Sequence, residues 1–250
     1  MTNSRQNSGF FEIDVDTMRE RFDAAIRNCL DNETIQSFSE DVSPTALNDS
    51  MQQLFTILST INHPDKSEGT LLEQEMSDLP DYAMGLLGKL CEIAKTLDCD
   101  DSLAIFEQLS IPLMIWFAKH KFVIHDIELF VNAISNTANQ IQNPQQLAEL
   151  TDVIDVIIAV FSADIKADLD KSNPGRPWRV LNLNQAIIAT RSLDPKRMES
   201  VFEQLVFRLP EDAPGFFAEG MEQMDIIDYP DHVRHVMQTY YQLTNQPTLH

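Results

Sequence analysis

The sequence predicts an all-α protein, either a multi-helix bundle or a short irregular helical-repeat solenoid of about ten helices. Apolar residues recur at three- and four-residue steps along almost the whole chain, and only 7 of the 250 residues are glycine. Positions at such steps share one face of a helix, whereas a strand would scatter them over both faces. The β-branched stretch at 122–124 is too short to predict a sheet.

Successive apolar stripes place the helices in order along the chain. Representative stripes are Val15, Met18, Phe22, Ile26 and Cys29, then Leu47, Met51, Leu54 and Leu58, then Ala83, Leu87, Leu90 and Ala94, and later Met198, Val201, Phe202 and Leu205, followed by Val233, Val236, Met237 and Tyr240. The predicted helices span 14–31, 45–62, 80–97, 100–109, 111–120, 125–138, 144–170, 178–192, 195–209, 213–227 and 230–244, and two of the short ones can merge.

Prolines support these boundaries. Ser43-Pro44, Asn143-Pro144 and Asp194-Pro195 each place an N-cap side chain before a residue that lacks an N–H, which suits the first turn of a helix. Pro112, Pro210, Pro214 and Pro230 mark further predicted boundaries.

The helical pattern predicts a single domain over 13–245, with a subdivision near 139–144 or 171–177 as an alternative. Residues 1–12 are predicted to be disordered, although residues 10–11 can still dock on the body of the domain. The sequence Phe-Glu-Gln-Leu occurs at Phe106 and again at Phe202, and a proline follows each. A degenerate repeat of this kind would suit a solenoid of helix pairs in the HEAT or TPR style, although no known repeat signature is matched.

Composition excludes several classes of protein. The formal net charge of −21 argues against a nucleic-acid-binding protein, because phosphate groups would be repelled. No apolar run is long enough to span a membrane, and the first residues lack the apolar core of a signal peptide. Three cysteines without C-x-x-C spacing indicate a reduced, cytoplasmic chain. Cys29 and Cys91 lie on apolar faces and are expected in the core, whereas the acidic neighbours of Cys99 argue against a nucleophile.

The most unusual segment is 171–179, where Arg176, Trp178 and Arg179 follow a Pro-Gly turn, with Arg191 further along. Two arginines beside a tryptophan suit a protein interface or the binding of a carboxylate or phosphate. The structural alternative is a connecting loop whose tryptophan fills the core while its arginines pair with nearby acids.

Metal signals are weak, and no metal or other cofactor is predicted. Asp164 and Asp168 share a helix face, as Mg²⁺ ligands do in some helical enzymes, but a solvated helix face explains them more simply. His232 and His235 also share a face, without evident third and fourth ligands. Phosphate-binding glycine loops, G-x-S-x-G and H-E-x-x-H are absent from the sequence.

A cluster of aromatic residues and methionines near the C-terminus has two interpretations. The cluster comprises Phe216, Phe217, Met221, Met224 and Tyr229, and it lies near Tyr240 and Tyr241 in the predicted order. Their helical spacing favours core packing, although methionine-rich surfaces also adapt to partners.

The leading hypothesis is a non-enzymatic, cytosolic interaction protein that binds a basic surface of another protein through a groove between helices. The alternative is a helical enzyme or ligand-binding domain that holds an anionic small molecule with Arg176 and Arg179, with Mg²⁺ on Asp164 and Asp168. The third hypothesis is that the chain forms a homo-oligomer through the apolar surfaces of its helices.

Overall fold

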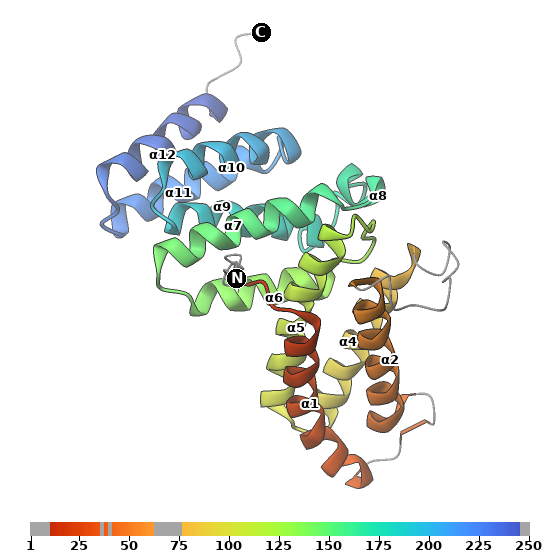
Figure 1. Cartoon of the computed structure of the whole chain (residues 1–250). Helices are drawn as coiled ribbons and strands as arrows, with labels where there is room; N and C mark the ends of the chain where they lie inside the picture. Colours follow the sequence, from red (N-terminus) through yellow and green to blue (C-terminus); the bar gives the residue numbers. More distant parts are fainter. Residues whose placement is uncertain (1–10, 36–37, 40–41, 63–76, 246–250) are drawn as a thin grey trace, which may run out of the picture. The chain divides into compact units, whose positions relative to one another are not determined.

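The structure, a computed structural model, describes residues 11–35, 38–39, 42–62 and 77–245 (Figure 1). These residues form an all-α fold without strands, which confirms the predicted class. The helices are α1 (Val15–Asp31), α2 (Pro44–Asn62), α4 (Leu79–Thr96), α5 (Asp100–Lys119), α6 (Glu128–Gln140), α7 (Pro144–Ala159), α8 (Ala163–Ala167), α9 (Pro177–Arg191), α10 (Pro195–Arg208), α11 (Ala213–Ile226) and α12 (Asp231–Thr244), with a 3-10 helix η1 (Glu33–Ile35). Among the described helices, none is both long and apolar enough to cross a lipid bilayer.

The three helix starts predicted from proline are confirmed, because α2, α7 and α10 begin at Pro44, Pro144 and Pro195. The side-chain oxygen before each proline accepts a hydrogen bond from an N–H of the first turn. Ser43 accepts from Ala46 at 3.1 Å, Asn143 from Gln145 at 2.9 Å, and Asp194 from Lys196 at 3.0 Å.

The boundary predicted at Pro112 is wrong, and the two short helices around it merge into α5. Pro112 lacks the N–H that would bond to the carbonyl one turn earlier, which weakens a helix interior. The helix nevertheless continues because residues 111–118 are buried on all sides. Burial of so many apolar side chains outweighs one missing backbone hydrogen bond.

The long helix predicted over 144–170 is also wrong, because α7 ends at Ala159 and α8 begins at Ala163. Between them, Ile124 and Phe161 form an isolated parallel bridge. The N–H of Ile124 donates to the carbonyl of Val160 at 3.1 Å, and the N–H of Ser162 donates to the carbonyl of Ile124 at 2.9 Å. These backbone groups are therefore not available to continue the helix.

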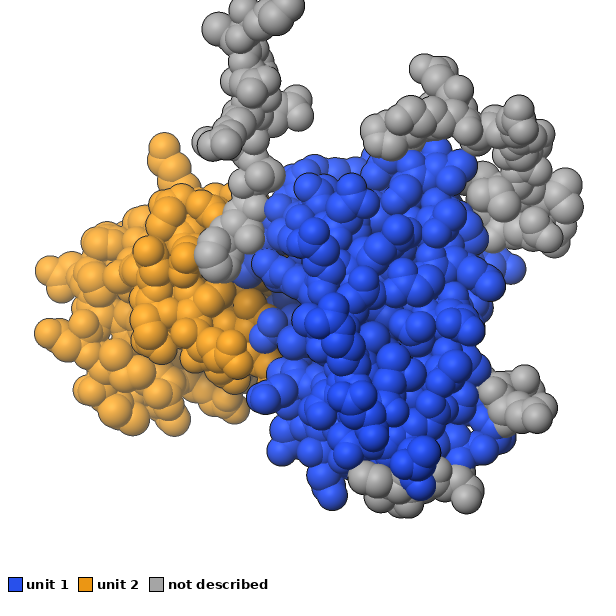
Figure 2. Space-filling model, turned by 60° about the horizontal axis from the view of Figure 1, so that its bottom comes forward, with its two compact units in different colours: residues 1–134, 159–162 blue, residues 135–158, 163–250 orange. Residues whose placement is uncertain are grey.

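The chain divides into two compact units, which are coloured separately in Figure 2. Unit 1 comprises residues 1–134 and 159–162, and unit 2 comprises residues 135–158 and 163–250. The single domain expected over 13–245 stays a prediction, since two compact units can still fold cooperatively. Of the segment predicted to be disordered, residues 1–10 lie outside the described residues, whereas Phe11 is buried and Glu12 pairs with Lys119.

Unit 1 is organised around four helices in which α1 contacts α2 and α5, and α4 contacts the same two helices. Phe22 of α1 lies at the centre, with its ring 5.7 Å from that of Phe55 and 5.8 Å from that of Phe106. All three rings are fully buried. This closed arrangement is the four-helix bundle that the sequence left open as one of two architectures.

Unit 1 also contains the three cysteines, all of them buried and free. Burial raises the pKa of Cys91 to about 12. Burial, with a smaller contribution from Cys99, raises the pKa of Cys29 to about 11. Core packing of Cys29 and Cys91 is therefore confirmed.

In unit 2, α9 packs on α10, and α12 packs on both α10 and α11. Phe202 of α10 lies at the centre, with ring centroids 5.0 Å from Phe217 of α11 and 5.3 Å from Tyr240 of α12. Phe106 and Phe202, the two starts of the suspected repeat, are thus fully buried in their respective units. The chain paths diverge after them, because Pro112 lies inside α5 whereas Pro210 follows the end of α10. The repeat stays a prediction.

The helical glycines provide a test of packing. A Cβ at Gly85 or Gly88 of α4 would meet no atom within 4 Å, whereas a Cβ at Gly220 of α11 would lie 2.6 Å from Sδ of Met237. Gly85→Ala and Gly88→Ala should each raise the free energy of unfolding by about 0.5–1 kcal/mol, because alanine loses less backbone entropy in a helix. Gly220→Ala should bring no gain. Thermal and urea unfolding followed by circular dichroism measure all three, and equal gains would contradict the close packing at Gly220.

The thiols provide a second test. We expect no reaction of the folded protein with Ellman's reagent at pH 8, and full reaction of all three cysteines in guanidinium chloride. Because the folded state holds the thiol protons of Cys29 and Cys91 more tightly, the free energy of unfolding should be unaffected below the ordinary thiol pKa of 9.0 and fall as the pH rises above it. Rapid labelling of the folded protein would show that this core opens.

Candidate functional site

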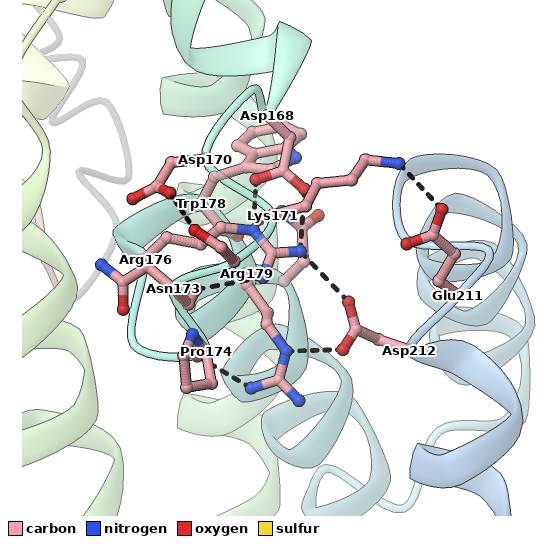
Figure 3. Close-up of polar contacts among 12 residues, drawn as sticks. Asp168, Asp170, Lys171, Asn173, Pro174, Arg176, Trp178, Arg179, Glu211 and Asp212 are labelled. Atoms are coloured by element: carbon pink, nitrogen blue, oxygen red, sulfur yellow. Dashed lines mark hydrogen bonds and ion pairs between the residues drawn. The ribbon is translucent and has the colours of Figure 1, made fainter.

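The arginine-rich segment singled out in the sequence forms an ion-pair network inside unit 2 (Figure 3). Nε of Arg176 donates to Oδ1 of Asp168 at 2.5 Å, and its Nη2 donates to Oδ2 of the same carboxylate at 2.9 Å. Nη2 also reaches Oδ2 of Asp212 at 3.3 Å, while Nε of Arg179 donates to Oδ1 of Asp212 at 2.6 Å. Two guanidinium groups thus face two carboxylates, and their charges balance.

Local backbone geometry explains how this network forms. Asp168 follows α8 with φ of 47°, a left-handed conformation that aspartate tolerates better than most residues. The next turns bring the chain back to Arg176, the residue before α9. Asp212 is the residue before α11. The network therefore connects the starts of α9 and α11.

Burial strengthens the Arg176–Asp168 pair, since the two side chains are only 9% and 7% exposed. The hydrogen bond to Asp168 is the main cause that raises the pKa of Arg176, against the opposing effect of burial. The Arg179 side chain is 28% exposed, and its pair with Asp212 is more accessible to water. The network is therefore tightest where it is least accessible to an external anion.

Trp178 and Arg208 complete the inner side of this region. Trp178 is 5% exposed, and the guanidinium carbon of Arg208 lies 5.6 Å from the centre of its ring. Arg208 also donates from Nη1 to Oδ1 of Asn182 at 3.1 Å, and burial lowers the pKa of Arg208. These contacts agree with the alternative in which the segment is a connecting loop, with its tryptophan in the core and its arginines paired with acids.

The fourth predicted residue, Arg191, lies at the other end of α9. Its Nη1 donates to the carbonyl of Ala138 at 2.8 Å and its Nη2 to the carbonyl of Ile141 at 2.7 Å. Ala138 lies in the last turn of α6 and Ile141 directly follows the helix, where partial negative charge attracts a cation. Arg191 therefore does not share the network of Arg176 and Arg179.

The predicted metal ligands do not gather into a site. Asp168 is paired with Arg176, and Asp164 is exposed on α8. His235 is exposed on α12, and Nε2 of His232 lies 3.2 Å from the carbonyl oxygen of Leu193. Within the part of the chain that the structure describes, no group of three or more His, Cys, Asp or Glu could hold a metal ion.

A pocket that the sequence did not identify as a site lies in unit 2, and we call it the α9–α11 pocket. Its volume is about 330 Å³, within the range of pockets that hold small molecules or partner side chains. The apolar lining comprises Ile187, Phe216, Met224, Ile227, Tyr229 and Met237. Thr190, Arg191, Glu219, Gly220 and Gln223 complete it. Arg191 is the only one of the four arginine-region candidates in this lining.

The floor of the pocket depends on a glycine. Met224 and Met237 are buried, and Gly220 allows α11 to approach Met237 more closely than a residue with a Cβ would. Arg234 of α12 binds the turn that follows α11. Its Nε donates to the carbonyl of Tyr229 at 2.9 Å, and its Nη2 donates to the carbonyl of Ile227 at 3.1 Å. These two hydrogen bonds hold the turn that closes this end of the lining.

The rim of the pocket includes accessible apolar side chains. Ile187 is 47% exposed and Ile227 is 46% exposed, and the adjacent Ile226 is 76% exposed. Sequence patterns singled out Phe216, Met224 and Tyr229 as an aromatic and methionine cluster, and Met224 indeed lies in the core. They did not identify Ile187, because α9 also buries polar residues and its two faces differ little in the sequence.

The ion-pair network yields a test of stability. Arg176→Met should lower the free energy of unfolding by about 3–5 kcal/mol, because it leaves the buried Asp168 without its cation. Arg179→Met should cost less than about 1 kcal/mol, since water screens the more exposed pair. Urea unfolding of both variants gives the comparison, and Arg176→Met/Asp168→Asn should recover part of the loss. Equal small costs for the two single variants would contradict the buried pair.

Comparisons of the chain with models of protein families, with curated proteins and with solved structures found no match. The contacts within unit 2 are therefore the basis on which a function can be assigned. Those contacts present two features, an ion-pair network that is balanced and largely inward, and an apolar pocket with an accessible rim.

Proposed function

We propose that this is a cytosolic protein-interaction protein that binds a partner through the α9–α11 pocket. The observation that carries the proposal is the pocket's accessible rim, where Ile187 and Ile227 expose nearly half of their surface beside Ile226. Exposed apolar surface around a concave site is typical of sites that bind another protein. The two methionines of the floor suit this role, since methionine adapts its shape to a partner's side chain.

The proposal moves the interaction site away from the arginine-rich segment. Arg176 and Arg179 already face Asp168 and Asp212, and an incoming anion would have to displace these carboxylates. Their role in the proposal is to hold the start of α11 against the start of α9, so that the two main walls of the pocket keep their positions. The absence of an evident catalytic motif in the sequence is consistent with binding as the main activity.

The test is a comparison of two matched variants as baits in an affinity pull-down. Ile187→Glu places a charge on the rim of the pocket, whereas Val156→Glu places the same charge on α7 at a side chain that is equally exposed, at 50%. We expect a protein to be retained by the wild type and by Val156→Glu and lost by Ile187→Glu. The protein identified in this way is then purified, and its dissociation constant is measured by calorimetry with each variant.

Two controls make the outcome decisive. All baits must show the same helical circular dichroism, and light scattering must show the same mass for each. Loss of binding with both variants, or with neither, would contradict the pocket as the binding site. A smaller mass for Ile187→Glu alone would show that a second copy of the chain covers the pocket, which would also overturn the proposal.

A further inference from the structure

The charge around the pocket is strongly one-sided. Between Arg208 and Arg234 the chain contains seven acidic residues and no lysine or arginine. Three of the seven are paired, since Glu211 pairs with Lys171, Asp212 pairs with the two arginines of the network, and Asp228 pairs with Arg234. The other four are Glu219, Glu222, Asp225 and Asp231, and all of them are exposed. The wall formed by α11 and the turn after it therefore carries unneutralised negative charge.

This charge lies close to the apolar lining. Phe216, Gly220, Gln223 and Met224 follow one another at steps of three, four or one residue, so they share a face of α11. Glu219 lies at the edge of that face and lines the pocket itself. Glu222 follows three residues later, which places it beside Glu219 on the helix surface. A residue that flanks an apolar group in the pocket would thus meet the carboxylate of Glu219 first, with that of Glu222 beyond it on the outer surface of α11.

The positive charges on the opposite side are already engaged. Arg191 uses two of its donor groups on carbonyls at the end of α6, where the helix dipole offsets its charge. Arg234 donates to two carbonyls of the turn after α11 and lies 3.8 Å from Asp228. The acidic residues of α11 therefore favour a partner whose binding surface is positively charged.

We infer that the partner's binding element is a basic amphipathic helix whose apolar face enters the α9–α11 pocket and whose lysines or arginines lie beside Glu219 and Glu222. This inference rests on the proposed function and specifies the chemistry of the partner. A groove between two helices is a common receptor for an amphipathic helix, whose anchors recur at three- and four-residue steps. The acidic wall contributes attraction and orientation, which weaken as salt screens the charges.

The test uses the full chain and fluorescein-labelled helical peptides as probes. The first peptide has leucine at positions i, i+3, i+4 and i+7 and lysine elsewhere. A second peptide replaces each lysine by glutamate, and a third has the leucine–lysine composition in an order that is not amphipathic. Fluorescence anisotropy should show saturable binding of the first peptide, weakened by salt, and at least about tenfold weaker binding of the other two.

Charge-reversal variants locate the binding. Glu219→Lys/Glu222→Lys should weaken binding of the leucine–lysine peptide roughly tenfold. The control is Glu199→Lys/Glu203→Lys, which changes the net charge equally through two exposed glutamates of α10 and should weaken binding less than about twofold. The milder Glu219→Gln/Glu222→Gln replaces the first variant if its circular dichroism differs from that of the wild type.

Each remaining outcome is decisive. Equal losses from the two charge-reversal variants would mean attraction to the overall charge and would overturn the inference. Equal binding of the lysine and glutamate peptides, both weakened by Ile187→Glu, would overturn the basic partner but leave the pocket as the binding site. Failure of Ile187→Glu to weaken any peptide would instead overturn the proposed function, and binding of the glutamate peptide alone would assign the site to Arg191.

Discussion

The arrangement of the two helices that line most of the pocket in unit 2 depends on the carboxylate of Asp212. It precedes α11 and binds Arg176 and Arg179, which lie at the start of α9. The two helices that form the main walls of the pocket are therefore joined at their first turns by charge-assisted hydrogen bonds, which are about twice as strong as neutral ones. Asp168 holds Arg176 from the other side and limits the directions in which its guanidinium group can turn.

At the other end of the pocket, backbone carbonyls take the place of the carboxylates. Arg191 fixes the end of α9 to the end of α6, and Arg234 fixes the turn after α11. The planar guanidinium group suits both tasks, because it offers several donors in a fixed geometry. Arginines thus hold both ends of the helices that line the pocket. Because the residues of the ion-pair network do not line the pocket, side chains of a partner can enter it without displacing that network.

The parts of the fold that depend on neighbouring residues could be predicted from the sequence, and the parts that depend on distant residues could not. The starts at Pro44, Pro144 and Pro195 follow from a proline and the side chain just before it. The break after Ala159 depends on Ile124, which lies far away in the sequence, and the continuity of α5 through Pro112 depends on burial by other helices. The candidate site follows the same rule. The unusual arginines were visible in the sequence, but Asp212, which balances them, lies 36 residues beyond Arg176.

The same distinction explains why net charge alone was a weak guide to the binding surface. A net charge of −21 indicates a basic partner but does not locate the binding surface, because it is a sum over the whole chain. The place of the binding surface becomes visible only when the acidic residues that form ion pairs are distinguished from those that do not. Glu211 and Asp212 are matched within unit 2, whereas Glu219 and Glu222 extend beside an apolar pocket. Attraction and apolar burial then act on adjoining parts of the α11 surface, and a ligand must satisfy both to bind there.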